Sequence, residues 1–168
     1  MKKTIKLLAS SRVTDDGVIA MVAPHLVNGD DPLYSVNGVF NAIFVHGNML
    51  GDAMFYGQGA GKEATASAVV ADVIEEAQCF GTGKMSEWSP EKQELLDVSE
   101  TKKRYFVRFQ GDASDLTEAE CCFGKVNAVV APLAGEFGFT TGVMTEKEYQ
   151  ACAAKTDRVI SMLRVREK

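Results

Sequence analysis

A glycine-rich turn is the first feature of the sequence that could carry chemistry. Within "AMFYGQGAGKEATASAVVADVIEEA" (residues 53–77), Gly59, Gly61 and Ala64 fit the spacing G-x-G-x-x-G/A, which in dinucleotide-binding proteins lies between a strand and a helix. Glycines let a ligand approach the backbone closely, and the free N–H groups at a helix start favour an anion or a polar cofactor edge. The turn therefore predicts a place where part of a cofactor could bind.

The context of the turn does not fit a complete nucleotide site. A Walker A loop would need Gly and then Ser or Thr at positions where the sequence has Tyr56 and Glu63. A dinucleotide fingerprint needs a βαβ unit with an acidic residue about 20 positions further on, whereas this predicted helix runs into a polar segment. On spacing alone, a tight packing turn explains the glycines equally well.

Other residues that often carry chemistry are sparse. His25 and His46 share no metal-ligand spacing, and the four cysteines (Cys79, Cys121, Cys122 and Cys152) form no CxxC pair. We interpret the histidines as structural and the cysteines as free thiols of a reducing cytosol, and we expect no metal.

Charge and hydropathy limit the possible partners and the location. The net charge of −5 argues against nucleic acid and anionic membranes as partners. Lys6 interrupts the apolar run of "MKKTIKLLAS" before it could act as a signal peptide, and no apolar span is long enough for a transmembrane helix. We expect a cytoplasmic protein.

The turn must be positioned by the strands before it and the helix after it. Apolar runs at residues 4–10, 17–27, 38–47 and 50–57 predict two hairpins. Because these runs are almost continuously apolar, we expect a sheet covered on both faces. The helix is indicated by an apolar stripe at helical spacing, formed by Ala66, Val69, Val70, Val73, Ile74 and Ala77.

A polar segment at residues 81–100 reads as a linker between two folding units. Ser89-Pro90 favours a short helix that ends near Asp97, and Trp88 is expected to pack on one neighbour. The residues after the linker predict strands and helices in the order β-α-β-β-α-β, a ferredoxin-like plan, with strands at 103–110, 127–135, 137–145 and 158–166 and helices within 114–126 and 146–155.

Four segments, in order, resemble one known family. "VAPHLV", "DPLYSVNGVFNAIFV", "GDAMFYGQGAG" and "ATASAVVADVIE" resemble the C-terminal part of the catalytic region of homoserine dehydrogenase, over residues 4–78. The resemblance implies an NAD(P)-dependent oxidoreductase that interconverts L-homoserine and L-aspartate 4-semialdehyde in threonine and methionine biosynthesis. It further implies that Gly59, Ala60 and Gly61 line the cofactor, opposite a phosphate loop in an N-terminal domain absent from this chain.

The same resemblance assigns no catalytic residue to these 168 residues. The family's catalytic lysine and substrate-holding acidic residues lie upstream, and Lys6 aligns with a structural strand. We therefore expect the isolated chain to be inactive and to hold no cofactor alone. The apolar stripe would pack on the N-terminal domain, and the family's sheet pairing implies a homodimer.

Residues 101–168 resemble the ACT regulatory domain that often follows this enzyme. "GDASDLTEAECCFG" replaces the turn that helps ACT domains bind an effector, which leaves an amino-acid effector open. The fold class expected is α+β, with a mixed sheet and a returning helix at 1–80, a linker at 81–100 and an ACT-like domain at 101–168. The alternative is a free-standing ACT-type amino-acid-sensing protein without catalysis.

Overall fold

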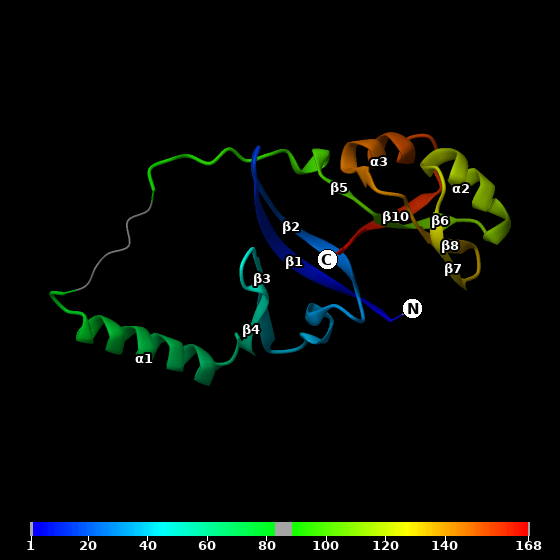
Figure 1. Ribbon diagram of the computed structural model, residues 1–168. Helices are drawn as coiled ribbons and strands as arrows, with labels where there is room; N and C mark the ends of the chain where they lie inside the picture. Colours follow the sequence, from blue (N-terminus) through cyan, green and yellow to red (C-terminus); the bar gives the residue numbers. More distant parts are fainter. Residues whose placement is uncertain (1, 83–88, 168) are drawn as a thin grey trace. The chain divides into compact units, whose positions relative to one another are not determined.

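The chain has an α+β fold with a mixed sheet and few helices, as predicted (Figure 1). The computed structural model describes residues 2–82 and 89–167. Two compact units divide it: residues 1–29 with 93–168, and residues 30–92. No helix in the described ranges combines the length and the apolar character needed to span a membrane.

The first unit is built on a six-stranded mixed sheet. Every neighbouring pair is antiparallel except β2 and β10, which are parallel. The strand order is β1 (Lys3–Thr14), β2 (Gly17–Asn28), β10 (Val159–Val165), β6 (Tyr105–Gln110), β8 (Glu136–Thr140) and β7 (Asn127–Leu133). Helices α2 (Leu116–Phe123) and α3 (Glu146–Ala153) and the short pair β5 (Lys102–Lys103) and β9 (Met144–Thr145) complete the unit.

An aromatic core lies between this sheet and its two helices. Alternate residues of β6, namely Tyr105, Val107 and Phe109, are fully buried, as a strand covered on one face requires. Phe139 of β8 lies opposite Val107 and contacts Phe123 of α2, with ring centroids 5.5 Å apart. Because all these side chains share one sheet face, α2 and α3 cover that same face.

The second half of the chain follows the predicted β-α-β-β-α-β order. Helix α3 begins at a capping box in which the Glu148 N–H donates to Thr145 Oγ1 and the Thr145 N–H donates to Glu148 Oε2. Spacing in the sequence places Tyr149, Cys152 and Ala153 on one face of this helix. That face packs on the core, because Tyr149 is buried while Cys152 and Ala153 pack against it.

The first hairpin, β1–β2, belongs to the same compact unit as the C-terminal residues. Arg164 and Val165 of β10 pair with His25 and Leu26 of β2, and Val27 beside them is fully buried. The unit therefore crosses the boundaries that the sequence suggests at residues 80 and 100, because strand pairing joins segments that lie far apart along the chain.

The second unit contains the other predicted hairpin and helix. Its elements are a 3-10 turn (Pro32–Ser35), β3 (Phe40–Gly47), β4 (Gly51–Gln58) and α1 (Lys62–Gln78). The expectation that these strands are covered on both faces is wrong for this chain: Ile43 and Phe55 are each 67% exposed. A continuously apolar strand needs a layer on each face, and these side chains have none.

The predicted short helix between Ser89 and Asp97 is also wrong. This segment is extended, because β2 offers it a backbone partner: the Val18 N–H donates to the Glu94 carbonyl and the Leu96 N–H donates to the Val18 carbonyl, each at 2.9 Å. Trp88 lies outside the described residues.

His25 gives the first unit a pH-dependent stability. Burial lowers its pKa, and the charges of Lys103, Arg164 and Arg166 add to this, while a hydrogen bond with the Ala23 carbonyl opposes it. The folded state thus prefers neutral His25, so stability is full above the unfolded pKa of about 6.5 and falls as pH drops toward the folded value.

We expect the free energy of unfolding of the His25→Gln variant to fall less steeply than that of the wild type as the pH drops. The measurement is urea unfolding at several pH values, followed by the NMR signals of β6. The control variant His46→Gln changes the other unit and should show the same pH dependence as the wild type. If wild type and His25→Gln showed the same pH dependence of the free energy of unfolding, His25 would not be its cause.

Candidate functional site

The glycine turn joins the end of β4 to the start of α1. The Gly59 N–H donates to the Val39 carbonyl at 3.2 Å, which ties the turn to the residue before β3. Gly61 is the N-cap of α1 with φ +111° and ψ 144°, a conformation that residues with a Cβ rarely adopt. The strand–turn–helix layout predicted from the sequence is confirmed.

The two glycines of the turn serve different purposes. A Cβ on Gly59 would lie 1.8 Å from Asn41 Nδ2 and 2.8 Å from Asn41 Cγ, so any larger residue at position 59 would have to displace the exposed side chain of Asn41. A Cβ on Gly61 would meet no atom within 4 Å, so Gly61 is required by its backbone angle alone. Open space therefore lies in front of Gly61, at the start of the helix.

The start of α1 presents backbone donors without a side-chain cap. Gly61 makes no side-chain capping hydrogen bond, and the first N–H groups of any α-helix lack intrahelical partners. The helix dipole adds a partial positive charge at this end. A polar or anionic group could accept hydrogen bonds here, although Glu63 in the first turn makes the position less favourable for an isolated anion.

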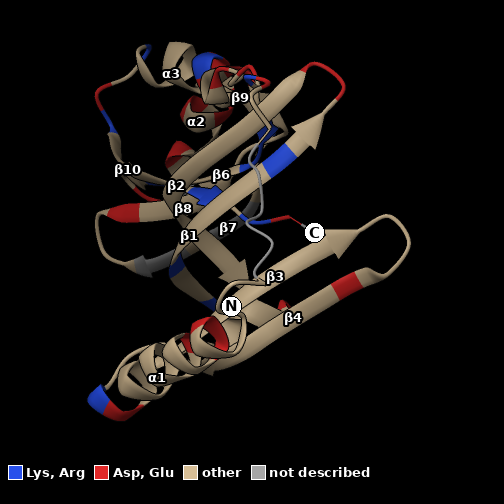
Figure 2. Cartoon of the chain, turned by 90° about the vertical axis from the view of Figure 1, so that its left-hand side faces the viewer, with Lys and Arg blue, Asp and Glu red and all other residues tan. Residues whose placement is uncertain are grey.

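The apolar stripe of α1 is uncovered. No residue of the helix is buried, and the four large side chains of the stripe are more than half exposed: Val69 56%, Val70 56%, Val73 63% and Ile74 52%. Figure 2 shows charged residues near the two ends of α1 and uncharged ribbon between them. Such a contiguous apolar surface is unusual on a soluble monomer and marks a place where another surface packs.

The described residues next to the turn in sequence include one lysine and one glutamate but no histidine. Lys62 and Glu63 are the ionisable residues next to it in sequence, and both are exposed. His46 lies at the other end of the β3–β4 hairpin, where its Nδ1 is 2.6 Å from Asp52 Oδ1. Among residues 2–82 and 89–167, no group of three His, Cys, Asp or Glu side chains could hold a metal ion.

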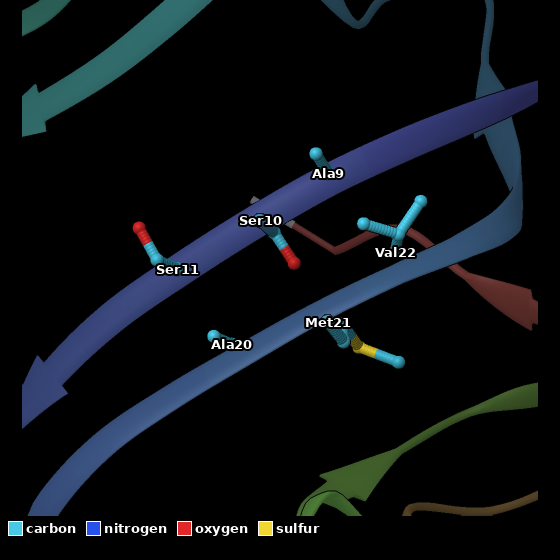
Figure 3. Close-up of a pocket in the computed structure, with 6 residues that line it drawn as sticks. All are labelled: Ala9, Ser10, Ser11, Ala20, Met21 and Val22. Carbon is cyan, nitrogen blue, oxygen red and sulfur yellow. The ribbon is translucent and has the colours of Figure 1, made fainter. Parts of the chain in front are cut away.

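A shallow depression of about 470 Å³ lies over the β1–β2 hairpin (Figure 3). Its lining side chains are Ala9, Ser10, Ser11, Ala20, Met21 and Val22, none of which is an acid, a base or a thiol. Neighbouring side chains point to opposite faces of the strands in the close-up, so they do not converge on one ligand. We assign no chemistry to this depression.

The predicted site residues Gly59, Ala60 and Gly61 therefore lie together on an exposed turn, and their role in cofactor binding stays a prediction. Sequence reasoning missed Asn41, whose side chain fills the space beneath Gly59. The signal was present: Asn41 lies in the segment "DPLYSVNGVFNAIFV" that carries the family resemblance, and its partner in the hairpin is Gly57, two residues before Gly59.

Comparison with known proteins connects this geometry to one family. A family model described as homoserine dehydrogenase matches residues 1–74. The homoserine dehydrogenase of Pseudomonas aeruginosa is 30% identical over 169 aligned residues, covering 96% of this chain and 36% of that protein. That of Helicobacter pylori is 32% identical over 128 residues, covering 76% of this chain and 29% of that protein.

A solved structure of the same family has the same fold as this chain. The crystal structure of a homoserine dehydrogenase from Thiobacillus denitrificans superposes with a TM-score of 0.82 at 25% identity, covering 99% of this chain and 43% of that one. The chain thus spans less than half the length of the relatives it matches.

Asn41 and Gly59 provide a direct test of the turn. We expect Gly59→Ala to destabilise the β3–β4 hairpin by up to about 1 kcal/mol, the lower end of overpacking effects, because the exposed Asn41 side chain can move aside in part. The measurement is hydrogen exchange in β3 and β4, which should become faster. Gly57→Ala meets open space and should change stability by less than about 0.5 kcal/mol. Adding Asn41→Ala should recover most of the loss in Gly59→Ala. Equal effects of the two glycine variants would contradict the packing described for Asn41.

Proposed function

This chain belongs to the homoserine dehydrogenase family, and from that premise we propose that it forms the C-terminal portion of an NAD(P)-dependent enzyme that interconverts L-homoserine and L-aspartate 4-semialdehyde. In this proposal, Gly59, Ala60 and Gly61 form one wall of the cofactor site, and the rest of the enzyme supplies the opposite wall. The pathway proposed is threonine and methionine biosynthesis in the cytoplasm.

One observation carries the proposal: α1 directly follows the glycine turn, and its apolar stripe is uncovered. Burying side chains such as Val73 and Ile74 would contribute about 1.5–3 kcal/mol each, so the stripe favours a packing partner strongly. A domain packed on this face would lie beside the start of the helix. The same contact would then stabilise α1 and close a site over Gly61.

The chemistry sets what the remainder of the enzyme must provide. Oxidation of an alcohol needs a base that takes the hydroxyl proton, and the bound nicotinamide ring supplies the hydride acceptor. This chain can offer a close backbone approach at Gly61 and polar N–H groups at the start of α1, which orient a ligand but move no proton. We propose that the proton-transfer residue comes from the rest of the enzyme.

For the segment of residues 101–168, which is part of the first unit, we propose an ACT-like role in amino-acid regulation and in assembly of a homodimer. The support is its β-α-β-β-α-β order and the strand order β10-β6-β8-β7, which gives a small domain with its own aromatic core. That independent core also favours the second candidate, a free-standing amino-acid-sensing protein. The uncovered stripe of α1 favours the enzyme, because an independent protein would cover such a surface within its own fold.

The proposal predicts that the purified 168-residue chain does not oxidise L-homoserine with either NAD or NADP, because the proton-transfer residue is proposed to come from the rest of the enzyme. The measurement is the formation of reduced nicotinamide by absorbance, with a complete homoserine dehydrogenase as the positive control. Turnover above the buffer blank that survives repurification would overturn the assignment of the proton-transfer residue to the rest of the enzyme.

The proposal also predicts that the stripe of α1 drives self-association of the isolated chain. We expect Val70→Gln with Ile74→Gln to lower binding of a hydrophobic dye and the mass measured by light scattering. The matched control is Asp72→Asn with Glu75→Gln, which changes the same helix off the stripe and should leave both readings unchanged. If the wild-type chain were a monomer and bound little dye, the result would instead favour the free-standing regulatory protein.

A further inference from the structure

The side chain of Asn41 lies against the glycine turn and makes no hydrogen bond there. Its Nδ2 atom is 1.8 Å from the position that a Cβ on Gly59 would take, and the side chain is exposed. Within the described part of the chain, the Asn41 carboxamide has no hydrogen-bond partner, whereas that of the nearby Asn37 donates to the Ser35 carbonyl at 3.2 Å. A group with two N–H donors and one carbonyl acceptor is therefore held beside the turn and available to a ligand.

The hairpin face that carries Asn41 is open at this end. The residue opposite Asn41 is Gly57, where an added Cβ would meet no atom within 4 Å. Gln58 points to the other face, because successive side chains of a strand alternate. Among the described residues of β3 and β4, Asn41 is the only polar side chain on its face, and the other positions there hold glycine or apolar residues. A ligand could therefore reach the Asn41 carboxamide without displacing another side chain.

Apolar side chains continue this face away from the turn. Ile43 and Phe55 lie opposite each other in the hairpin, two positions along the strands from Asn41 and Gly57, and each is 67% exposed. Residues two apart on a strand share a face of the sheet. The face thus combines a carboxamide at one end with an aromatic and an aliphatic side chain beside it, which suits a flat ring that bears a polar group on one edge.

The charges near Asn41 favour a neutral polar group over a phosphate. This face of the hairpin carries no charged side chain. Lys62 and Glu63, which follow the turn, are adjacent, exposed and opposite in charge, so their effects on a nearby ligand largely cancel. A carboxamide is itself neutral and binds best to a group that offers both a donor and an acceptor. The nicotinamide ring, which bears a carboxamide, has this chemistry.

We propose that Asn41 is a cofactor-binding residue whose side chain hydrogen-bonds the carboxamide of the nicotinamide ring; this rests on the function proposed above. The Asn41 NH2 group donates to the carbonyl of the ring's carboxamide, and the Asn41 carbonyl accepts from its NH2 group. The ring lies toward Ile43 and Phe55, and the missing side chains of Gly57 and Gly59 let it approach the backbone. In this role Asn41 orients the ring and moves no proton.

The test is an NMR titration of the full 168-residue chain with nicotinamide mononucleotide. The chain is expected to retain no cofactor on purification, but NMR detects the weak, millimolar binding of a ligand to one wall of a site. We expect saturable shifts of the side-chain NH2 signals of Asn41 and of the backbone N–H signals of Gly59 and Gly61. The side-chain signals of Asn48, at the tip of the same hairpin, should stay in place.

A matched ligand and a matched variant separate a direct hydrogen bond from a structural role. In the 3-acetylpyridine analogue of the mononucleotide, a methyl group replaces the NH2 group, so the wild type should bind it about fivefold more weakly, the effect of one lost hydrogen bond. We expect Asn41→Ala to remove this discrimination and Asn48→Ala to keep it. A variant that only loosened the turn would weaken both ligands alike. If Asn41→Ala loses the NMR signals of the folded hairpin, Asn41→Ser takes its place.

The signals of Gly59 and Gly61 distinguish a failure of this proposal from a failure of the function on which it rests. If they shift saturably while the wild type binds the two ligands equally, or while Asn41→Ala keeps the discrimination, the cofactor wall is supported and the role of Asn41 is overturned. If neither glycine signal shifts with either ligand, both the cofactor wall and the role of Asn41 are overturned.

Discussion

The apolar face of α1 is exposed, and the stability of the second unit depends on whether another surface covers it. A helix gains most of its stability from packing one face on a neighbour, yet no side chain of α1 is buried. The β3–β4 hairpin has the same property, with Ile43 and Phe55 largely exposed. A two-stranded hairpin is at best marginally stable alone in water. Both elements are therefore built to be completed by other surfaces.

The first unit differs from the second, because its own helices cover its aromatic core. Tyr105, Val107 and Phe109 are fully buried between the sheet and the helix side chains Phe123 and Tyr149. The chain thus combines a unit with a buried aromatic core and a unit whose large apolar side chains are mostly exposed. Under the proposed function this contrast has a meaning: the glycine turn lies in the second unit, where one packing contact would both cover a helix and close a ligand site.

Local patterns predicted the elements well and their surroundings poorly. The strand at β6, the helix at α3 and the glycine turn depend on neighbours in sequence, and each was predicted. The pairing of His25 with Arg164 joins residues far apart in the chain, which no periodicity reveals. The extended path at Leu95 replaced a predicted helix for the same reason. Continuous apolarity in β3 predicted cover on both faces, and this was wrong, because the described residues leave Ile43 largely exposed.

The most direct test of the account is hydrogen exchange along the isolated chain, at a concentration low enough to suppress self-association. If α1 awaits a covering surface, its amides should exchange close to the rate of an unprotected helix, while those of β6 and β8 exchange only with unfolding of the first unit. Amides of α1 as slow as those of β6 would show that the chain covers this helix by itself, and would contradict the central claim.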